Sequence, residues 1–376
     1  MSDLGPNAGL VGVADARTRL CTPALLLDLE AFEANIARMA RFAAARGLGL
    51  RPHAKSHKSV AVAQAQIAAG ALGICCATLG EMEAMAAAGI PGLLLTSPIA
   101  TPAKIARLVA LAAGGADIMA VADDAQVIAH LGAAATTAGV TLRLVIDLDI
   151  GLDRTGCAPS DAVMLAHAID DAPGLSLAGV QAYAGHHQHI VDPAARRAAT
   201  EASCATLADV VQSLEQAGYK PGIVSGAGTG TYDLAADAGT YSELQVGSYP
   251  FMDVQYLAVD YGPEGPPFAP SLFVAASVIS AGRVGGATTD AGLKAFATDG
   301  PPPDLARGAP EGASYRFQGD EHGRVVLPAG AAPMLPGAMV ECIVPHCDPT
   351  INLYDRIHCV RGETLEAIWP VDARGR

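Results

Sequence analysis

Short apolar runs alternate with amphipathic segments from about residue 49 to about residue 250. In the segment 101–113, for example, Ile105, Leu108, Val109 and Leu111 fall on one side of a helix. Strands that alternate with helices predict a parallel sheet, and eight such strands favour a closed (β/α)₈ barrel over an open sheet. The eight apolar runs are 48–52, 72–77, 92–97, 117–122, 142–148, 177–183, 222–226 and 242–247.

The chain has a different pattern on either side of these units. Residues 22–47 predict a strand and then a helix with Phe32, Ile36, Met39 and Phe42 on one stripe. After about residue 262, loops rich in proline and glycine separate apolar runs, which predicts a β-domain. Its predicted strands are 271–280, 315–320, 324–329 and 338–345. The predicted organisation is an α/β chain with an N-terminal strand, helix and barrel at 1–262 and a C-terminal β-domain at 263–376.

The composition narrows the class of protein. The chain has 376 residues, of which 51% are hydrophobic, so a large core is expected. A net charge of −14 without a basic patch argues against a nucleic-acid partner. No apolar run reaches about 18 residues, and the start lacks a secretory pattern. The eight cysteines show neither disulfide-framework nor zinc spacing. We therefore expect a soluble cytoplasmic protein with reduced thiols.

Polar residues follow several of the predicted strands, where a barrel places its chemistry. The stretch "RPHAKSHKS" at 51–59 holds two of the five lysines of the chain, Lys55 and Lys58. A solvated basic loop is the simplest interpretation of this stretch. The alternative is that the amine of Lys55 forms a Schiff base with a carbonyl group.

A glycine-rich stretch, "SGAGTG", follows the seventh predicted strand. Gly226, Gly228 and Gly230 let the backbone approach a phosphate, and the hydroxyls of Ser225 and Thr229 are further donors. Glycine-rich turns are common, but phosphate sites of barrels form after strands seven and eight. The stretch 247–249, which consists of Gly247, Ser248 and Tyr249, is then the second half of the predicted phosphate site.

A barrel-end lysine, a phosphate site and an arginine together suggest pyridoxal 5′-phosphate. Lys55 would hold the aldehyde of that cofactor, and Arg154, after the fifth strand, would hold its phenolate oxygen. Tyr183 ends the sixth strand and is followed by His186, His187 and His189. These histidines could be metal ligands, bases or a polar rim, and His189 is the candidate general base.

A second cluster lies in the predicted β-domain, in "VPHCDPTINLYD". On a strand, His346 and Asp348 would point to the same face, because side chains alternate. An imidazole and a carboxylate suit Mn²⁺, Mg²⁺, Co²⁺ or Zn²⁺. Cys347 is expected to point the other way, as a small buried side chain.

These stretches together resemble the pyridoxal-phosphate enzymes of the alanine-racemase fold, type III. Within that fold the chain is similar to the group of D-threonine aldolase, 3-hydroxy-D-aspartate aldolase and D-serine dehydratase. The matching stretches include "TPALLLDL", "RPHAKSHKS", "GLDRTGC", "QAYAGHHQH", "SGAGTGTY", "YSELQVGSYPFMD" and "PHCDPTINLYD", in family order over almost the whole length.

The resemblance implies a role for each matched residue. Lys55 is implied as the Schiff-base lysine and His189 as the base that takes the β-hydroxyl proton, while His346 and Asp348 are implied as the metal ligands. Gln245 stands where alanine racemases have an arginine that faces the pyridine nitrogen. The remaining implied cofactor residues are Arg154, Tyr183, Gly228, Thr229, Gly247, Ser248 and Tyr249. The resemblance also implies a homodimer.

The activity implied is metal-dependent retro-aldol cleavage of a D-3-hydroxy amino acid to glycine and an aldehyde. The stretches 77–81, 94–100 and 185–189 depart from the aldolase pattern at strand ends, where they would affect substrate choice. One alternative is a dehydratase that releases ammonia and a keto acid, but such enzymes carry a His-x-Cys pair where this chain has Asp348. A racemase, and a carrier that binds pyridoxal phosphate without catalysis, are weaker alternatives.

Overall fold

The computed structural model describes residues 4–376, which form two compact units that interleave along the chain. We call residues 38–55 and 62–247, with Arg376, the barrel unit. We call the described residues up to Ala37, with 56–61 and 248–375, the sheet unit. The predicted domain boundary at 262/263 stays a prediction.

The barrel unit is built on eight strands in the order β2-β9-β8-β7-β6-β5-β4-β3, and every neighbouring pair along that order is parallel. The strands are β2 (Gly49–Leu50), β3 (Cys75–Cys76), β4 (Leu93–Leu95), β5 (Ile118–Ala122), β6 (Leu142–Leu148), β7 (Leu175–Ala182), β8 (Ile223–Gly226) and β9 (Glu243–Leu244). Each falls within or overlaps one of the eight apolar runs. The predicted fold class is therefore confirmed.

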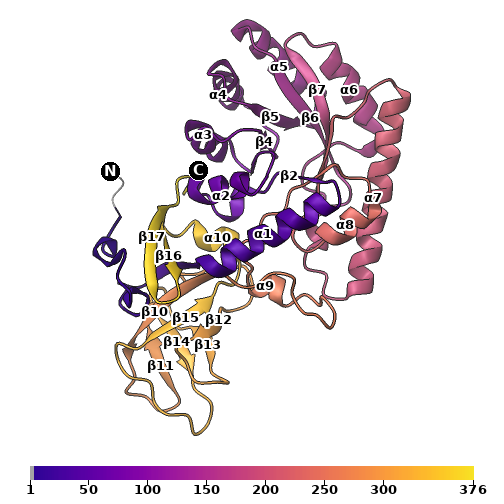
Figure 1. The fold of residues 1–376 in the computed structure, drawn as a ribbon. Coiled ribbons are helices and arrows are strands. Elements are labelled where there is room, and N and C mark those ends of the chain that lie inside the picture. The colour runs from indigo at the N-terminus through magenta and orange to yellow at the C-terminus, as the bar shows by residue number, and fades with distance from the viewer. Residues whose placement is uncertain (1–3) are drawn as a thin grey trace. The chain divides into compact units, whose positions relative to one another are not determined.

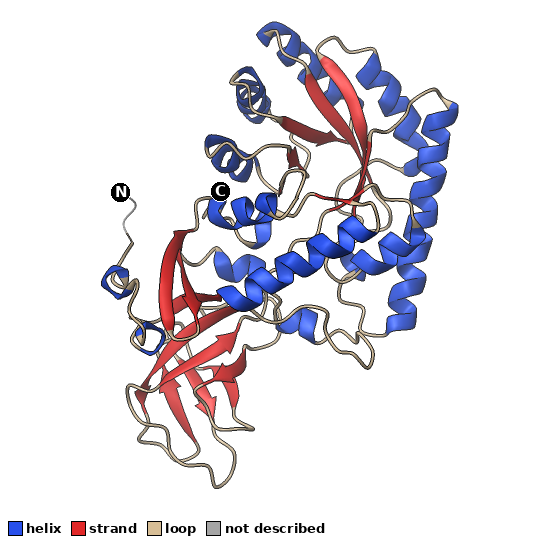
Figure 2. Ribbon diagram, in the orientation of Figure 1, coloured by secondary structure: helices blue, strands red, loops and turns tan. Residues whose placement is uncertain are grey.

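Helices connect these strands and lie outside them, as Figure 2 shows in blue and red. Helix α4 (Pro102–Ala113) has Thr101 as its N-cap and a proline in its first turn, and it buries Ile105, Leu108 and Val109 as predicted. The other helices of these connections are α2 (Val60–Ala68), α3 (Leu79–Ala87), α5 (Ala125–Ala138), α6 (Ala162–Asp170), α7 (Pro193–Gln216) and α8 (Tyr232–Ala238).

The two edge strands of the barrel sheet, β2 and β3, meet through a single bridge between His53 and Cys75. Arg51 reinforces this seam: it forms two hydrogen bonds of 2.9 Å to the carboxylate of Glu243 on β9, and it donates another to the carbonyl of Gly92. Both charged side chains are buried. Arg51 therefore links β9, through a buried bidentate ion pair, to the residue before β4, on either side of the least paired part of the sheet.

The sheet unit contains a mixed sheet with the path β13-β14-β11-β10-β1-β16-β17, and β15 joins β10 to β12. Strand β1 (Ala24–Asp28), followed by α1 (Leu29–Ala45), is antiparallel to β10 and parallel to β16. Most strands of this sheet come late in the chain (Figure 1). They are β10 (Leu272–Ser280), β11 (Gly286–Thr289), β12 (Asp304–Arg307), β13 (Ser314–Phe317), β14 (Gly323–Val326), β15 (Met339–Ile343), β16 (Arg356–Arg361) and β17 (Thr364–Pro370). Two short helices, α9 (Val254–Leu257) and α10 (Cys347–Ile351), complete the unit.

The four strands predicted after residue 262 correspond to β10, β13, β14 and β15. Strands β11, β12, β16 and β17 were not predicted. One local prediction is wrong: His346 and Asp348 do not lie on a strand, because His346 is the N-cap of α10 and Asp348 lies in the first turn of that helix.

We predict that Glu243→Gln lowers the free energy of unfolding by about 3–5 kcal/mol, because it leaves the guanidinium of Arg51 buried without a counter-charge. Urea titration measures this loss. Arg143→Ala is the control, because Arg143 pairs with Asp117 on the surface, and it should cost under about 1 kcal/mol. Equal losses in the two variants would contradict a special role of the buried pair.

Candidate active site

Lys55 lies in a short 3₁₀ helix (Ala54–Ser56) directly after β2, and its side chain is half-buried. Its backbone N–H donates to Nδ1 of His53 at 3.3 Å, and Nε2 of His53 is 3.0 Å from the hydroxyl of Thr96. This tie to the loop after β4 fixes the backbone that presents the lysine at the carboxyl end of the strands. The placement matches the predicted position of a Schiff-base lysine.

Arg154 lies on a loop after β6 that carboxylates hold in shape. Oδ1 of Asp149 accepts three backbone N–H groups, from residues 151, 152 and 153. Burial opposes the charged form of Asp149, but these hydrogen bonds outweigh it, and the pKa of the carboxyl is lowered. Asp147 accepts the hydroxyl of Thr155, and Asp123 accepts the N–H of Gly156. The loop is thus fixed on both sides of Arg154.

The guanidinium of Arg154 lies 5.9 Å from the ring centroid of Tyr183, at the end of β7. The structure therefore brings together two of the predicted cofactor residues, from neighbouring strands of the barrel sheet.

The glycine-rich loop after β8 contains a buried polar atom without a hydrogen bond. Thr229 is buried, and its hydroxyl oxygen has no hydrogen-bond partner among residues 4–376. Ala227, two residues earlier, has a left-handed backbone with φ of 59°. A buried hydroxyl without a partner is costly, and an oxyanion bound to this loop would satisfy it.

Ser225 and Gln245 have a different environment from Thr229. Both are buried, and Nε2 of Gln245 donates to the hydroxyl of Ser225 at 2.9 Å. That hydroxyl in turn donates to Oε1 of Glu243 at 2.7 Å. The hydroxyl of Ser225 is thus engaged inside the barrel sheet.

These contacts belong to a buried polar layer that the sequence analysis missed. Asp147, Gln181, Ser225 and Glu243 occupy matching register positions on four neighbouring strands, β6 to β9. Nε2 of Gln181 donates to Asp147 at 2.8 Å, and its Oε1 accepts from Gln245 at 3.0 Å. The signal in the sequence was the polar residues inside these four apolar runs, among them Asp147, Gln181, Ser225 and Glu243.

The layer has a fixed hydrogen-bond direction, because both of its ends are carboxylates. Because a carboxylate only accepts hydrogen bonds, the amide of Gln181 must donate to Asp147 through its N–H. For the same reason the hydroxyl of Ser225 must donate to Glu243. Burial raises the pKa of Asp147 to about 6, although hydrogen bonds from Gln181 and Thr155 oppose this shift.

The histidine loop after β7 contains three imidazoles in two environments. His186 and His189 are exposed, whereas His187 is buried, with its ring 4.0 Å from that of His186. Burial, and then the charge of His186, lower the pKa of His187 to about 4. His187 is therefore neutral at physiological pH. The role of His189 as a base stays a prediction.

Gly247 belongs to the barrel unit, and Ser248 and Tyr249 belong to the sheet unit. Tyr249 is buried with its ring 5.8 Å from that of Phe268. The carbonyl of Ser248 accepts the backbone N–H groups of Phe251 and Met252. That these three residues complete a phosphate site stays a prediction.

In the sheet unit, His346 lies between two carboxylates. Its Nδ1 is 2.7 Å from Oδ2 of Asp299, and its Nε2 is 3.7 Å from Oδ2 of Asp348. The second distance is longer than a hydrogen bond and is one that a cation with bonds of about 2.0–2.2 Å to each atom would span. A carboxylate on the other ring nitrogen is the usual partner of a metal-binding histidine. The pair therefore fits a divalent cation.

Cys347 is buried, as predicted, although its Sγ lies 3.3 Å from Oδ2 of Asp348. Its backbone N–H donates to Asp253 at 2.9 Å, which anchors the start of α10. Burial raises the pKa of Asp253. Within residues 4–376, no three histidine, cysteine or acidic side chains gather as a complete metal site, so the remaining ligands would be water or substrate.

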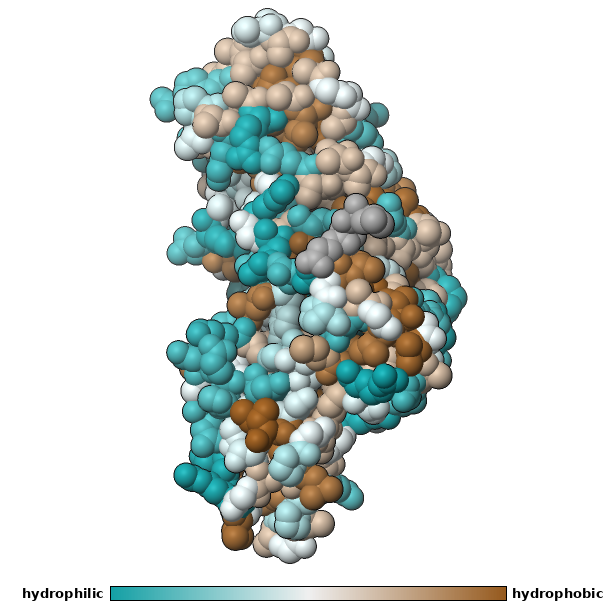
Figure 3. Space-filling view, turned by 90° about the vertical axis from the view of Figure 1, so that its left-hand side faces the viewer, coloured by the Kyte–Doolittle hydropathy of each residue, from teal (hydrophilic) through white to brown (hydrophobic). Residues whose placement is uncertain are grey.

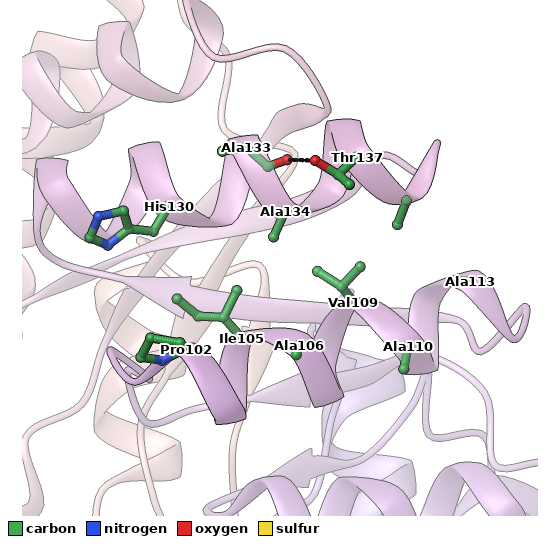
Figure 4. Close-up of a pocket in the computed structure, with 11 residues that line it drawn as sticks. Pro102, Ile105, Ala106, Val109, Ala110, Ala113, His130, Ala133, Ala134 and Thr137 are labelled. Atoms are coloured by element: carbon green, nitrogen blue, oxygen red, sulfur yellow. Dashed lines mark hydrogen bonds between the residues drawn. The ribbon is translucent and has the colours of Figure 1, made fainter.

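A cavity of about 660 Å³ lies elsewhere, between α4 and α5 on the barrel unit (Figure 4). Its lining side chains are mostly alanine, and the others are Pro102, Ile105, Val109, His130 and Thr137. The Thr137 hydroxyl donates to the carbonyl of Ala133, which leaves His130 as the one titratable side chain of the lining. This cavity offers no set of reactive groups, and it is not the candidate active site.

Comparison with known proteins identifies the family of the chain. Residues 27–254 match the model of the alanine racemase N-terminal domain, and residues 271–360 match a putative serine dehydratase domain. The chain is 39% identical to 3-hydroxy-D-aspartate aldolase of Paracoccus denitrificans over 94% of this chain and 92% of that protein. The chain belongs to the alanine-racemase-fold family that includes this aldolase. The predicted family is confirmed, and membership implies pyridoxal 5′-phosphate as the cofactor.

Solved structures support the same assignment. D-threonine aldolase from Filomicrobium marinum superposes with a TM-score of 0.91 at 38% identity, over 95% of this chain and 96% of that chain. D-threo-3-hydroxyaspartate dehydratase from Delftia sp. HT23 gives a TM-score of 0.83 at 26% identity, over 94% and 98%. The predicted enzyme class, a carbon–carbon lyase, agrees with the more similar of these two enzymes.

No helix within residues 4–376 combines the length and the apolar character needed to cross a membrane. On the face drawn in Figure 3, hydrophobic residues are mixed with hydrophilic ones.

We predict that Asp147→Asn changes how stability depends on pH. The folded pKa of about 6 lies above the ordinary aspartate value of 3.8, so the stabilisation from protonated Asp147 is full below pH 3.8 and is lost as the pH rises through about 6. Relative to wild type, the variant should therefore gain about 2 kcal/mol in free energy of unfolding between pH 4.5 and pH 7. Urea titrations of both proteins at the two pH values measure this difference, and parallel curves would contradict it.

Proposed function

We propose that this protein cleaves D-3-hydroxy amino acids, of the D-threonine or 3-hydroxy-D-aspartate kind, to glycine and an aldehyde. In this reaction the protein would use pyridoxal 5′-phosphate and a divalent cation. The observation that carries it is the pair His346 and Asp348, whose Nε2 and Oδ2 atoms are 3.7 Å apart in a chain that matches two aldolases over nearly its whole length.

The residues of the barrel unit fit the cofactor. Lys55 supplies an amine at a strand end, Arg154 a fixed guanidinium, and Thr229 a buried hydroxyl that lacks a partner. Pyridoxal 5′-phosphate supplies an aldehyde for the lysine and substrate amines, and an electron sink for cleavage at Cα. In this proposal Arg154 holds the phenolate oxygen, and the glycine-rich loop holds the phosphate.

The chain's own groups then move the protons. His346 and Asp348 would hold the cation, and a cation held there would supply Lewis-acid polarisation of the β-hydroxyl oxygen. The imidazole of His189 takes the proton from that oxygen. As the Cα–Cβ bond breaks, Cβ becomes the carbonyl carbon of the aldehyde and Cα takes up a proton to give glycine. The neutral state of His187 limits the positive charge near His189.

The proposal extends to the metal ion, the oligomeric state and the cellular location. The donor set of one imidazole and one carboxylate suits Mn²⁺, with Mg²⁺, Co²⁺ and Zn²⁺ as alternatives. The family resemblance suggests a homodimer that acts on a small amino acid, and the composition of the chain suggests the cytoplasm.

The direct test is to offer D-threonine, L-threonine, D-3-hydroxyaspartate, D-phenylserine and D-serine with pyridoxal phosphate and Mn²⁺, and to measure glycine, aldehyde and ammonia together. We expect equal amounts of glycine and aldehyde from D-substrates only, and a loss of at least about 10³-fold in Lys55→Ala, because the covalent amine is gone. Ammonia and a keto acid without glycine would show a dehydratase, and the absence of all three products would contradict cleavage and leave a racemase or a carrier.

Metal binding gives an independent test. Asp348→Asn should weaken binding of Mn²⁺, followed by electron paramagnetic resonance, by about 10-fold to 100-fold, because it removes an anionic ligand. Treatment with EDTA should abolish cleavage while the cofactor absorbance stays. Glu321→Gln, which changes an acid on the surface of the same unit, is the matched control and should bind Mn²⁺ as wild type does. Unchanged Mn²⁺ binding by Asp348→Asn would exclude this residue as a ligand.

A further inference from the structure

Gln188 belongs to the histidine loop, its side chain contacts the glycine-rich loop, and the residue is 1% exposed. Its Nε2 donates to the carbonyl of Ala184 at 3.1 Å and to the hydroxyl of Thr231 at 3.0 Å. Its Oε1 accepts the backbone N–H of Gly230 at 2.9 Å. Both N–H groups and the carbonyl oxygen are thus used to join the two loops.

The glycines of the loop are shaped around this glutamine. A Cβ atom at position 228 would lie 2.5 Å from Oε1 of Gln188, and one at position 230 would overlap the backbone carbonyl of Gln188. At positions 228 and 230, two of the glycines that suggested a phosphate site, a larger residue would therefore collide with Gln188. Thr229, whose buried hydroxyl has no partner, lies between them.

We propose that Gln188 is a positioning residue that holds the glycine-rich loop, residues 227–231, in the shape that receives the phosphate of the cofactor. This inference rests on the proposed function. Gln188 has no hydrogen-bonding group left for the phosphate, so it acts through Thr229 and the backbone of the loop. Its loss should weaken binding of the phosphate group and leave the reaction of Lys55 with an aldehyde unchanged.

The test compares pyridoxal 5′-phosphate with pyridoxal, which has the same aldehyde and ring but no phosphate. Cofactor-free wild type and Gln188→Met are titrated with each compound. The signal is the absorbance of the compound attached through its aldehyde to Lys55. We expect the Kd for pyridoxal 5′-phosphate to rise about 10-fold to 100-fold in Gln188→Met. The Kd for pyridoxal should change by less than about twofold, because methionine fills a similar volume.

Two further variants complete the design. Thr136→Val removes one side-chain hydrogen bond, to the carbonyl of Pro173, on another part of the barrel unit, and it should leave both Kd values unchanged. Thr231→Val removes one partner of Gln188 and should shift the ratio of the two Kd values in the same direction as Gln188→Met, but less. It supplies the test if Gln188→Met does not fold.

The outcomes separate the two claims. If Gln188→Met raises the Kd of both compounds by the same factor, Gln188 has a general structural role and the inference is overturned. If neither Kd changes, the inference is overturned as well. In both cases wild type still binds pyridoxal 5′-phosphate, so the proposed function survives. If wild type shows no absorbance that depends on Lys55, the proposed function and the inference fail together.

Discussion

The buried ion pair of Arg51 and Glu243 is the interaction on which the barrel unit depends. The pair lies beside the seam that the His53–Cys75 bridge closes, and the same guanidinium also donates to the carbonyl of Gly92, the residue before β4. Such a pair costs desolvation, so its value lies in geometry: two charges that must meet in the interior allow only one closure of the sheet. The same carboxylate accepts the hydroxyl of Ser225, which begins the polar layer.

The polar layer explains how a barrel with apolar strands supports a polar site. The layer fills the interior with hydrogen bonds whose directions are set by carboxylates at both ends. Short loops at the strand ends present Lys55, Arg154 and Thr229, and each loop has a hydrogen bond to the loop after another strand. In this arrangement the reactive groups are few, and the residues that position them are many.

Sequence patterns predicted the eight barrel strands well, because each is an apolar run bounded by a helix signal, and barrel topology then placed Lys55 and Arg154 at strand ends. They did not predict the polar layer, since the pairing of Gln181 with Asp147 depends on strand register, which hydropathy does not encode. Helix α10 has five residues, too few for a helical period, so the surroundings of His346 were assigned to a strand. Gln188 was missed because its partners come from two separate loops.

In the proposed function Lys55 carries the cofactor, and one measurement tests this most directly. The protein, loaded with pyridoxal 5′-phosphate, is reduced with borohydride and digested, and the modified peptide is sequenced by mass spectrometry. We expect a phosphopyridoxyl group on Lys55 and none on Lys58. Modification at Lys58, or at no single lysine, would contradict this role of Lys55.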